Sequence, residues 1–198
     1  MDSYYRQSGQ NIGRGAAQIG NNLIKETRNL ITELFHCPNK KVVFVSSATE
    51  ALNIILQGLT IVDNFNIYIS PFEHNAVVRV IEYLQTIYKL NVKELEVNKV
   101  TLDYDLEKIK YQFSEDKPNV VVISHASNVC GVLAPIEQIC TMSKQYGAIN
   151  VIDMCQTARA GRQGRRDAVR LPRALRAGPR CLRLSRRHRL HEAHARGG

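Results

Sequence analysis

The chain lacks paired cysteines, a secretory signal and a long apolar run. Its five cysteines form no Cys-x-x-Cys pair, and an odd count without a signal fits a reducing compartment better than a disulfide framework. The first residues, Met1 to Arg6, lack the apolar region of a signal peptide. No run approaches the length of a membrane span. We therefore expect a soluble, cytoplasmic protein without a membrane partner.

Glycine-rich phosphate loops are also missing. Gly13, Gly15 and Gly20 fit neither the dinucleotide fingerprint nor the P-loop, because their spacing differs and no strand precedes them. Asn21 also stands where a P-loop has lysine. A nucleotide-dependent α/β enzyme is therefore disfavoured.

The positive charge is confined to one end of the chain. The formal net charge is +9, but residues 159–198 contain thirteen Arg, no Lys and only two acidic residues. Residues 1–158 contain fourteen basic and sixteen acidic residues, so they carry no basic footprint for nucleic acid. We predict one folded domain over residues 1–158 and a disordered, Arg-rich tail over residues 159–198.

Two interpretations of the tail are open. One is a basic arm that binds nucleic acid or an acidic partner. The other is a segment never selected as protein, such as a frame slip through GC-rich coding sequence. The composition changes inside a predicted element, directly after Ala158, which favours the second interpretation and makes a nucleic-acid partner disfavoured. His191 and His194 are one residue short of the zinc-protease spacing; in this composition we attribute them to chance and predict no metal site.

Residues 1–158 alternate between helical and strand patterns. This alternation favours βαβ units and a three-layer α/β fold, with a mostly parallel sheet covered by helices on both faces. Pro135 suits the first turn of a helix, and Gly147 suits a helix end. The predicted helices are 16–35, 48–59, 73–88, 106–113 and 135–146, and the predicted strands are 41–46, 66–70, 92–97, 119–124 and 148–153.

Polar segments follow four of the predicted strands, at residues 46–50, 73–75, 124–128 and 153–156. The carboxyl ends of parallel strands share one edge of a sheet, so we expect these segments to converge on one crevice. Each has an ordinary alternative: the first is a typical helix cap, and a single His such as His74 is more often a cap or a packed ring than a ligand. Asp153, at the end of a buried strand, needs a partner.

Together these segments resemble the large domain of fold-type I enzymes that use pyridoxal phosphate (PLP), specifically the class V aminotransferases of the cysteine desulfurase group. The likeness covers about residues 5–158, in the expected order. The similar segments are Phe44–Asn53 (phosphate binding), Glu73–Arg79 (the His that stacks on the cofactor), Ser124–Gly131 (a strand-end motif), Val151–Ala158 (Asp-x-x-Gln) and Asn11–Gly15 (Asn-x-x-Arg near the substrate).

The resemblance implies a role for each matching residue. Asp153 would pair with the ring nitrogen of PLP and keep it protonated. His74 would stack on the ring and relay protons, which makes it the catalytic candidate. Asn128 and Gln156 would bind the oxygen side of the ring, and Thr49 the phosphate. The predicted cofactor-binding residues are Ala48, Thr49, His74, Asn128, Asp153 and Gln156.

The chain departs from the family at the Schiff base. Relatives bind PLP through a Lys beyond the Asp-x-x-Gln motif, whereas the last lysine here is Lys144, and arginine is no nucleophile. The family's first segment and its small C-terminal domain also have no counterpart. We therefore expect an inactive or very weak fragment of an enzyme of the cysteine desulfurase type, which converts L-cysteine to L-alanine and persulfide sulfur. The resemblance further implies a homodimer and a sulfur acceptor.

Overall fold

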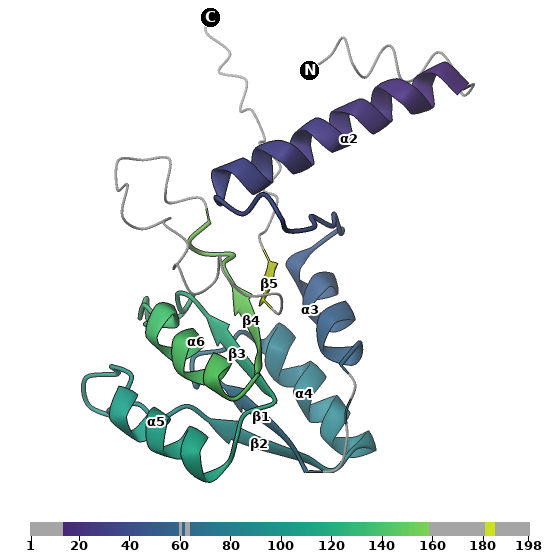
Figure 1. The fold of residues 1–198 in the computed structure, drawn as a ribbon. Helices are drawn as coiled ribbons and strands as arrows, with labels where there is room; N and C mark the ends of the chain where they lie inside the picture. Colours follow the sequence, from purple (N-terminus) through teal and green to yellow (C-terminus); the bar gives the residue numbers. More distant parts are fainter. Residues whose placement is uncertain (1–13, 60, 62–63, 159–180, 185–198) are drawn as a thin grey trace, which may run out of the picture. The chain divides into compact units, whose positions relative to one another are not determined.

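The computed structural model describes residues 14–59, 61, 64–158 and 181–184, and it divides the chain into two compact units, Met1–Phe44 and Val45–Gly198 (Figure 1). The first unit contains α2 (Arg14–Leu34), which is the helix predicted for residues 16–35. In the same unit the guanidinium carbon of Arg28 lies 5.6 Å from the centre of the Phe44 ring, within the range of a cation–π contact.

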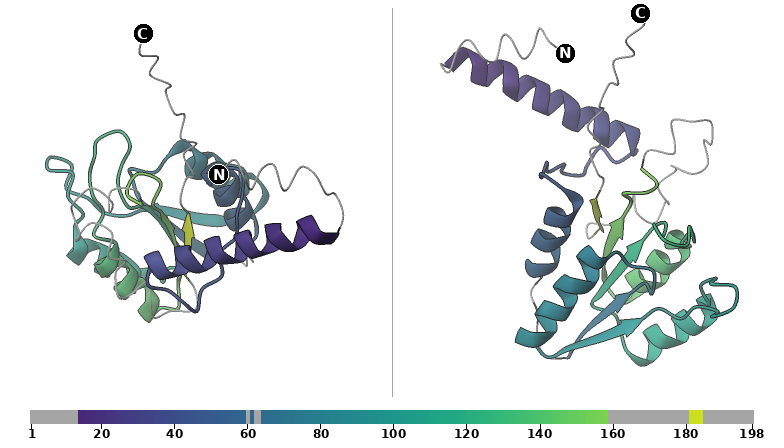
Figure 2. Two further views of the ribbon diagram at one scale, coloured as in Figure 1. Left: turned by 90° about the horizontal axis from the view of Figure 1, so that it is seen from above. Right: turned by 180° about the vertical axis from the view of Figure 1, so that it is seen from behind.

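The second unit is a parallel sheet between two layers of helices. Its described strands lie in the order β2-β1-β3-β4-β5, and all of their pairings are parallel. α3 and α4 cover one face and α5 and α6 the other (Figures 1 and 2), which confirms the predicted three-layer α/β fold. The elements are β1 (Phe65–Ile69), β2 (Leu90–Glu94), β3 (Val120–Ser124), β4 (Ile149–Asp153), β5 (Cys181–Leu184), α3 (Ala48–Gln57), α4 (Asn75–Ile87), α5 (Leu106–Glu115) and α6 (Ile136–Gln145).

Alternate residues of the strands face opposite helix layers. On one side, the ring of Tyr68 in β1 lies edge-on to that of Phe113 in α5, with ring centres 4.9 Å apart. Asn150 in β4 accepts a hydrogen bond of 2.8 Å from the hydroxyl of Ser143 in α6, so this buried polar pair is satisfied. The other side packs against α3 and α4 in one apolar core, to which the strands contribute Phe65, Ile67, Ile69, Leu90, Val120, Val122 and Val151.

The strand predicted for residues 41–46 is wrong. The segment has no strand structure, and Val43, Phe44 and Val45 are 77%, 40% and 38% exposed. An apolar, β-branched run becomes a strand only where another strand supplies hydrogen-bonding partners. Neither edge of the described sheet pairs with this segment.

Other elements differ from prediction at their ends. The strand predicted for residues 92–97 is β2, which starts and ends earlier, and Val97 forms an isolated bridge with Tyr104. The helix predicted from Glu73 begins two residues later, because His74 is its cap. Within the predicted tail the structure places β5 beside β4, a strand that the sequence does not predict. Residues 159–180 and 185–198 of that tail lie outside the described residues.

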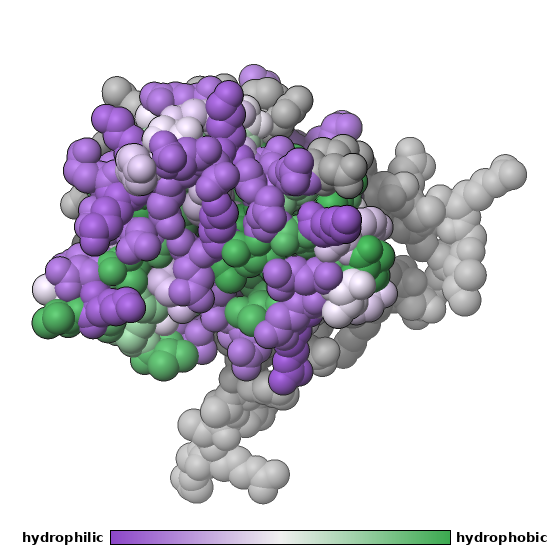
Figure 3. Space-filling view, turned by 90° about the horizontal axis from the view of Figure 1, so that it is seen from below, coloured by the Kyte–Doolittle hydropathy of each residue, from purple (hydrophilic) through white to green (hydrophobic). Residues whose placement is uncertain are grey.

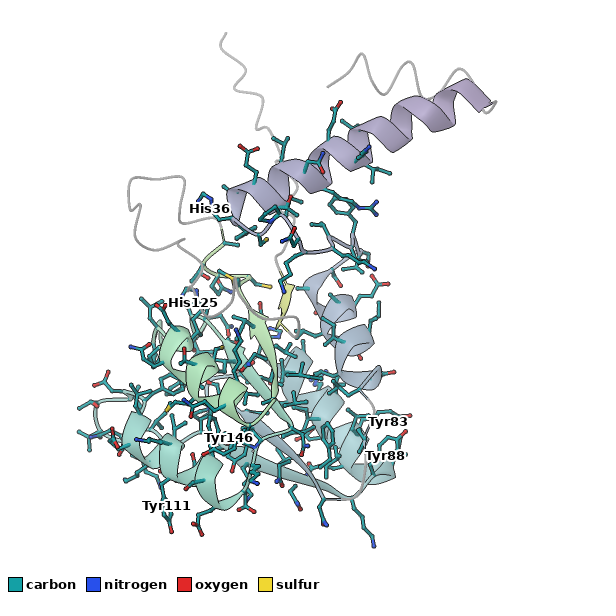
Figure 4. All side chains as sticks on the ribbon, in the orientation of Figure 1. His36, Tyr83, Tyr88, Tyr111, His125 and Tyr146 are labelled. Atoms are coloured by element: carbon teal, nitrogen blue, oxygen red, sulfur yellow. The ribbon has the colours of Figure 1, made fainter. Side chains whose placement is uncertain are left out.

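The surface of the second unit carries apolar side chains in small groups. Seen from below, the molecule is mainly hydrophilic, with separate hydrophobic groups between the polar side chains (Figure 3). Tyr83 and Tyr88 at α4 and Tyr111 of α5 are exposed and lie on the outside of their helices (Figure 4). None of the described helices is long and apolar enough to cross a membrane.

We predict that the Tyr68→Phe substitution lowers the free energy of unfolding by about 1 kcal/mol. The Tyr68 hydroxyl lies 2.9 Å from the carbonyl oxygens of both Gln112 and Asp116 at the end of α5. Burial, with a contribution from Asp116, raises the pKa of Tyr68 to about 12, so the hydroxyl stays a neutral donor. Urea unfolding measures the loss.

The matched control is Tyr111→Phe, which removes the same hydroxyl from a side chain of α5 that is 65% exposed. Its effect should stay within about 0.5 kcal/mol. Equal effects of the two substitutions would contradict a stabilising role for the Tyr68 hydroxyl.

Candidate functional site

The order of the strands changes direction between β1 and β3. β2 lies outside β1, and the chain then returns to the other side of β1 to form β3. In α/β sheets ligands bind at the carboxyl ends of the strands beside such a switch point. A cavity of about 140 Å³ lies at this edge, lined by Ala48, Thr49, Leu52, His74, Ala76, Ser124, Ala126, Asn128, Asp153, Cys155 and Gln156.

The structure brings together all six residues that the sequence singles out for cofactor binding. They belong to the starts of α3 and α4, the loop after β3 and the turn after β4, and all of them line the 140 Å³ cavity. The fifth motif is different: Asn11 lies outside the described residues, and Arg14 is described only as the first residue of α2.

The first turn of α3 provides backbone donors to the cavity. Ser47 is the N-cap in an extended conformation, and its hydroxyl accepts a 3.1 Å hydrogen bond from the N–H of Glu50. The N–H groups of Ala48 and Thr49 precede that position, where a helix offers no intrahelical carbonyl. This end of the cavity therefore favours an anion.

His74 is both a helix cap and a wall of the cavity. Its Nδ1 accepts a 3.1 Å hydrogen bond from the N–H of Ala76, which caps α4. An accepting Nδ1 leaves the proton of a neutral ring on Nε2. His74 is therefore a helix cap, which is the ordinary alternative that its sequence position suggested, and its exposed ring also lines the cavity.

Asp153 is the carboxylate of the cavity. It ends β4, is 8% exposed, and its Oδ1 accepts a 2.8 Å hydrogen bond from the N–H of Cys155. Asn128 and Gln156 are exposed at the cavity wall, so their amides are available to a ligand. The wall of the cavity therefore offers one carboxylate, that of Asp153, and two neutral amides, those of Asn128 and Gln156.

Glu73 is a functional candidate that sequence reasoning missed. Its carboxylate accepts hydrogen bonds from the N–H (2.5 Å) and the hydroxyl (2.8 Å) of Ser124 at the end of β3. The pKa of Glu73 is raised to about 7, mainly by burial and to a smaller extent by the nearby Asp153, while the two bonds from Ser124 act in the opposite direction. The only sequence signal was an acidic residue between a strand end and a helix cap.

His125 lies beside the cavity rather than in its wall. Its Nδ1 is 2.8 Å from the hydroxyl of Thr157, which ties the end of β3 to the turn after β4. Burial lowers the pKa of His125, so the ring is neutral at neutral pH. Figure 4 shows this ring near the ends of those strands.

A larger cavity of about 560 Å³ lies beside α3 and α4. Thr49, His74 and Ala76 line both cavities, whereas Asp153, Asn128 and Gln156 line only the smaller one. Arg79 is the cationic residue of the larger wall. We place the candidate site in the smaller cavity because it contains the strand-end polar groups.

No cluster suited to a metal ion exists among the residues that the structure describes. His191 and His194 lie outside those residues.

Comparisons with known proteins show which family the chain belongs to. The family model "Aminotransferase class-V" matches residues 1–163. A probable cysteine desulfurase of Halalkalibacterium halodurans is 26% identical over 167 residues, covering 80% of this chain and 40% of the relative. The chain thus spans about two-fifths of the length of the curated relatives it matches.

Solved structures show the same fold. The apo cysteine desulfurase of Thermococcus onnurineus NA1 superposes with a TM-score of 0.68 at 22% identity, over 79% of this chain and 40% of that one. A C-DES structure with glycine covalently linked to its PLP cofactor gives a TM-score of 0.66 at 18% identity, over 76% and 41%. With its family model matched over most of its described length, the chain belongs to the class-V aminotransferase family.

Proposed function

We propose that the 140 Å³ cavity is a PLP-binding site of the cysteine desulfurase type. The observation that supports this most directly is the convergence of six residues from four separate segments on one cavity, with the buried carboxylate of Asp153 among them. Cysteine desulfurases among the relatives and solved structures point in the same direction.

The chemistry of the lining residues fits this cofactor. A phosphate group suits the N–H groups of Ala48 and Thr49 at the start of α3. The aromatic ring suits the exposed imidazole of His74, and the ring oxygen suits the amides of Asn128 and Gln156. A protonated ring nitrogen is the partner that the buried carboxylate of Asp153 needs.

When bound, PLP supplies an electron sink for bonds to the α-carbon of an amino acid. The protein residues would hold and orient it: Asp153 would keep a positive charge on the ring nitrogen, and Thr49 would bind the phosphate. His74, whose neutral ring carries its proton on Nε2, would supply the group that moves a proton beside the cofactor.

L-Cysteine is the proposed substrate, with alanine and persulfide sulfur as products, because the matched relatives are named as cysteine desulfurases. A homodimer and a sulfur acceptor belong to the same proposal.

No lysine is among the described residues that line the cavity, and the sequence has none after Lys144. Lys144 lies near the end of α6, just before β4 begins, and therefore near the amino ends of the strands, whereas the cavity lies at their carboxyl ends. We infer that the 198-residue chain holds the cofactor without the covalent anchor needed for turnover.

The Asp153→Asn substitution should weaken binding of pyridoxine 5′-phosphate about tenfold or more, because it removes a charge-assisted hydrogen bond. This ligand has no aldehyde, so it does not react with surface lysines. Thermal shifts across a ligand titration measure the affinity. Asp103→Asn, which neutralises an exposed carboxylate of the same unit, is the control and should bind as the wild type does. Equal affinity of the Asp153 variant and the wild type would count against the site.

Substitution of Thr49 by valine should weaken binding of pyridoxine 5′-phosphate roughly three- to tenfold, because the hydroxyl at the start of α3 is lost. Binding of pyridoxine, which lacks the phosphate, should not change. The pair of ligands serves as the control. A parallel loss for both ligands would indicate damage to the cavity and not loss of a phosphate contact.

The 198-residue chain with PLP should form alanine from L-cysteine no faster than PLP alone. The physical reason is the absence of a lysine among the cavity residues. Chromatographic measurement of alanine checks this outcome, with PLP and an unrelated protein of equal lysine content as the control. Alanine formation well above that control, and abolished by Asp153→Asn, would show that the chain turns over without this lysine.

A further inference from the structure

Glu73 connects the start of α4 to the end of β3. Both oxygens of its carboxylate are used, one by the N–H and one by the hydroxyl of Ser124. Ser124 is in register with Asp153 on the neighbouring strand β4. Ser124 and Asp153 both line the cavity, and so does His74, which follows Glu73 in the chain. The carboxylate of Glu73 therefore holds two walls of the cavity together.

Two carboxylates, those of Glu73 and Asp153, consequently share this region. Burial and the neighbouring Asp153 raise the pKa of Glu73 to about 7. Tyr104, whose hydroxyl lies 2.6 Å from that of Ser70, stays neutral because burial, with a smaller contribution from Glu73, raises its pKa to about 12. His125, which follows Ser124 in the chain, has a pKa lowered by burial.

We propose that Glu73 is a positioning residue that fixes the end of β3 and sets the charge beside Asp153, so that the cavity binds a cationic aromatic ring more tightly when Glu73 is ionised. This inference rests on the proposed function for the identity of the ligand. The hydrogen bonds that carry it are independent of any ligand.

The raised pKa of Glu73 determines how the stability of the protein and its affinity for a cation change with pH. The unfolded chain releases the proton of Glu73 near pH 4.3, roughly, whereas the folded chain keeps it until about pH 7. Ionisation of Glu73 therefore costs stability as the pH rises through this window, and the full cost is present above it. A bound cation offsets the repulsion between Glu73 and Asp153, so its affinity rises over the upper part of the same window.

The first experiment compares thermal unfolding of the full chain in the wild type and Glu73→Gln from about pH 5 to about pH 8. The glutamine can accept from the Ser124 N–H and donate to its hydroxyl, so the connection is kept without the charge. Relative to this variant, the wild type should lose several degrees of Tm across the range, since about 1 kcal/mol corresponds to roughly 2–4 °C for a chain of this size.

Glu82→Gln is the matched control, because it removes an exposed carboxylate from α4, the helix that follows Glu73, and it should follow the wild type. Glu73→Asp, which keeps a titrating carboxyl, provides a second variant if the glutamine form does not fold, and it should retain a pH-dependent Tm. Identical pH profiles of the wild type and Glu73→Gln would overturn the assignment.

The second experiment measures binding of pyridoxine 5′-phosphate to the wild type and Glu73→Gln at about pH 6 and about pH 8. The ligand's own ionisation is common to both proteins and cancels in the ratio of affinities. The wild type should gain roughly three- to tenfold over the variant as the pH rises. A constant ratio would overturn the effect on the ligand. Failure of both proteins to bind would overturn the proposed function and the ligand effect with it, while the Tm comparison still decides the role of Glu73 in the apoprotein.

Discussion

The carboxylate of Asp153 constrains the whole carboxyl edge of the sheet. It is buried at the end of β4, and it lies close enough to a second carboxylate, that of Glu73, to help raise the pKa of Glu73. Two ionised groups so placed repel each other unless one takes up a proton or a cation lies between them. The two hydrogen bonds from Ser124 favour the ionised form of Glu73 and so act against its protonation. Asp153 lines the 140 Å³ cavity, where a bound cation would reduce the repulsion.

The fold and most of the candidate site could be predicted from the sequence because they depend on patterns local to each element. Strong apolar strands such as 119–124 and 148–153 alternate with amphipathic helices, and that alternation has few compact solutions. Once the strands are parallel, their carboxyl ends share one edge. The convergence of His74, Asn128 and Asp153 then follows without any knowledge of distances.

The remaining features depend on pairings that the local sequence does not contain. Residues 41–46 have the composition of a strand, yet no described strand pairs with them, and β5 pairs with β4 although its own segment carries no strand pattern. Glu73 is similar: its role depends on Ser124, which lies 51 residues away in the chain. Its raised pKa results from burial, which a single acidic residue in a sequence does not indicate.

The register between β3 and β4 determines which face of the sheet Asp153 lies on. Val151 and Asp153 point to the same side of β4. Asn150 points to the other side, where its amide oxygen accepts a hydrogen bond from the hydroxyl of Ser143. A slip of one residue would exchange these sides, burying the acid against α6 and turning an aliphatic side chain toward the 140 Å³ cavity. Such a slip would also remove Val151 from the apolar core. The packing that fixes the position of Val151 therefore also fixes the orientation of Asp153.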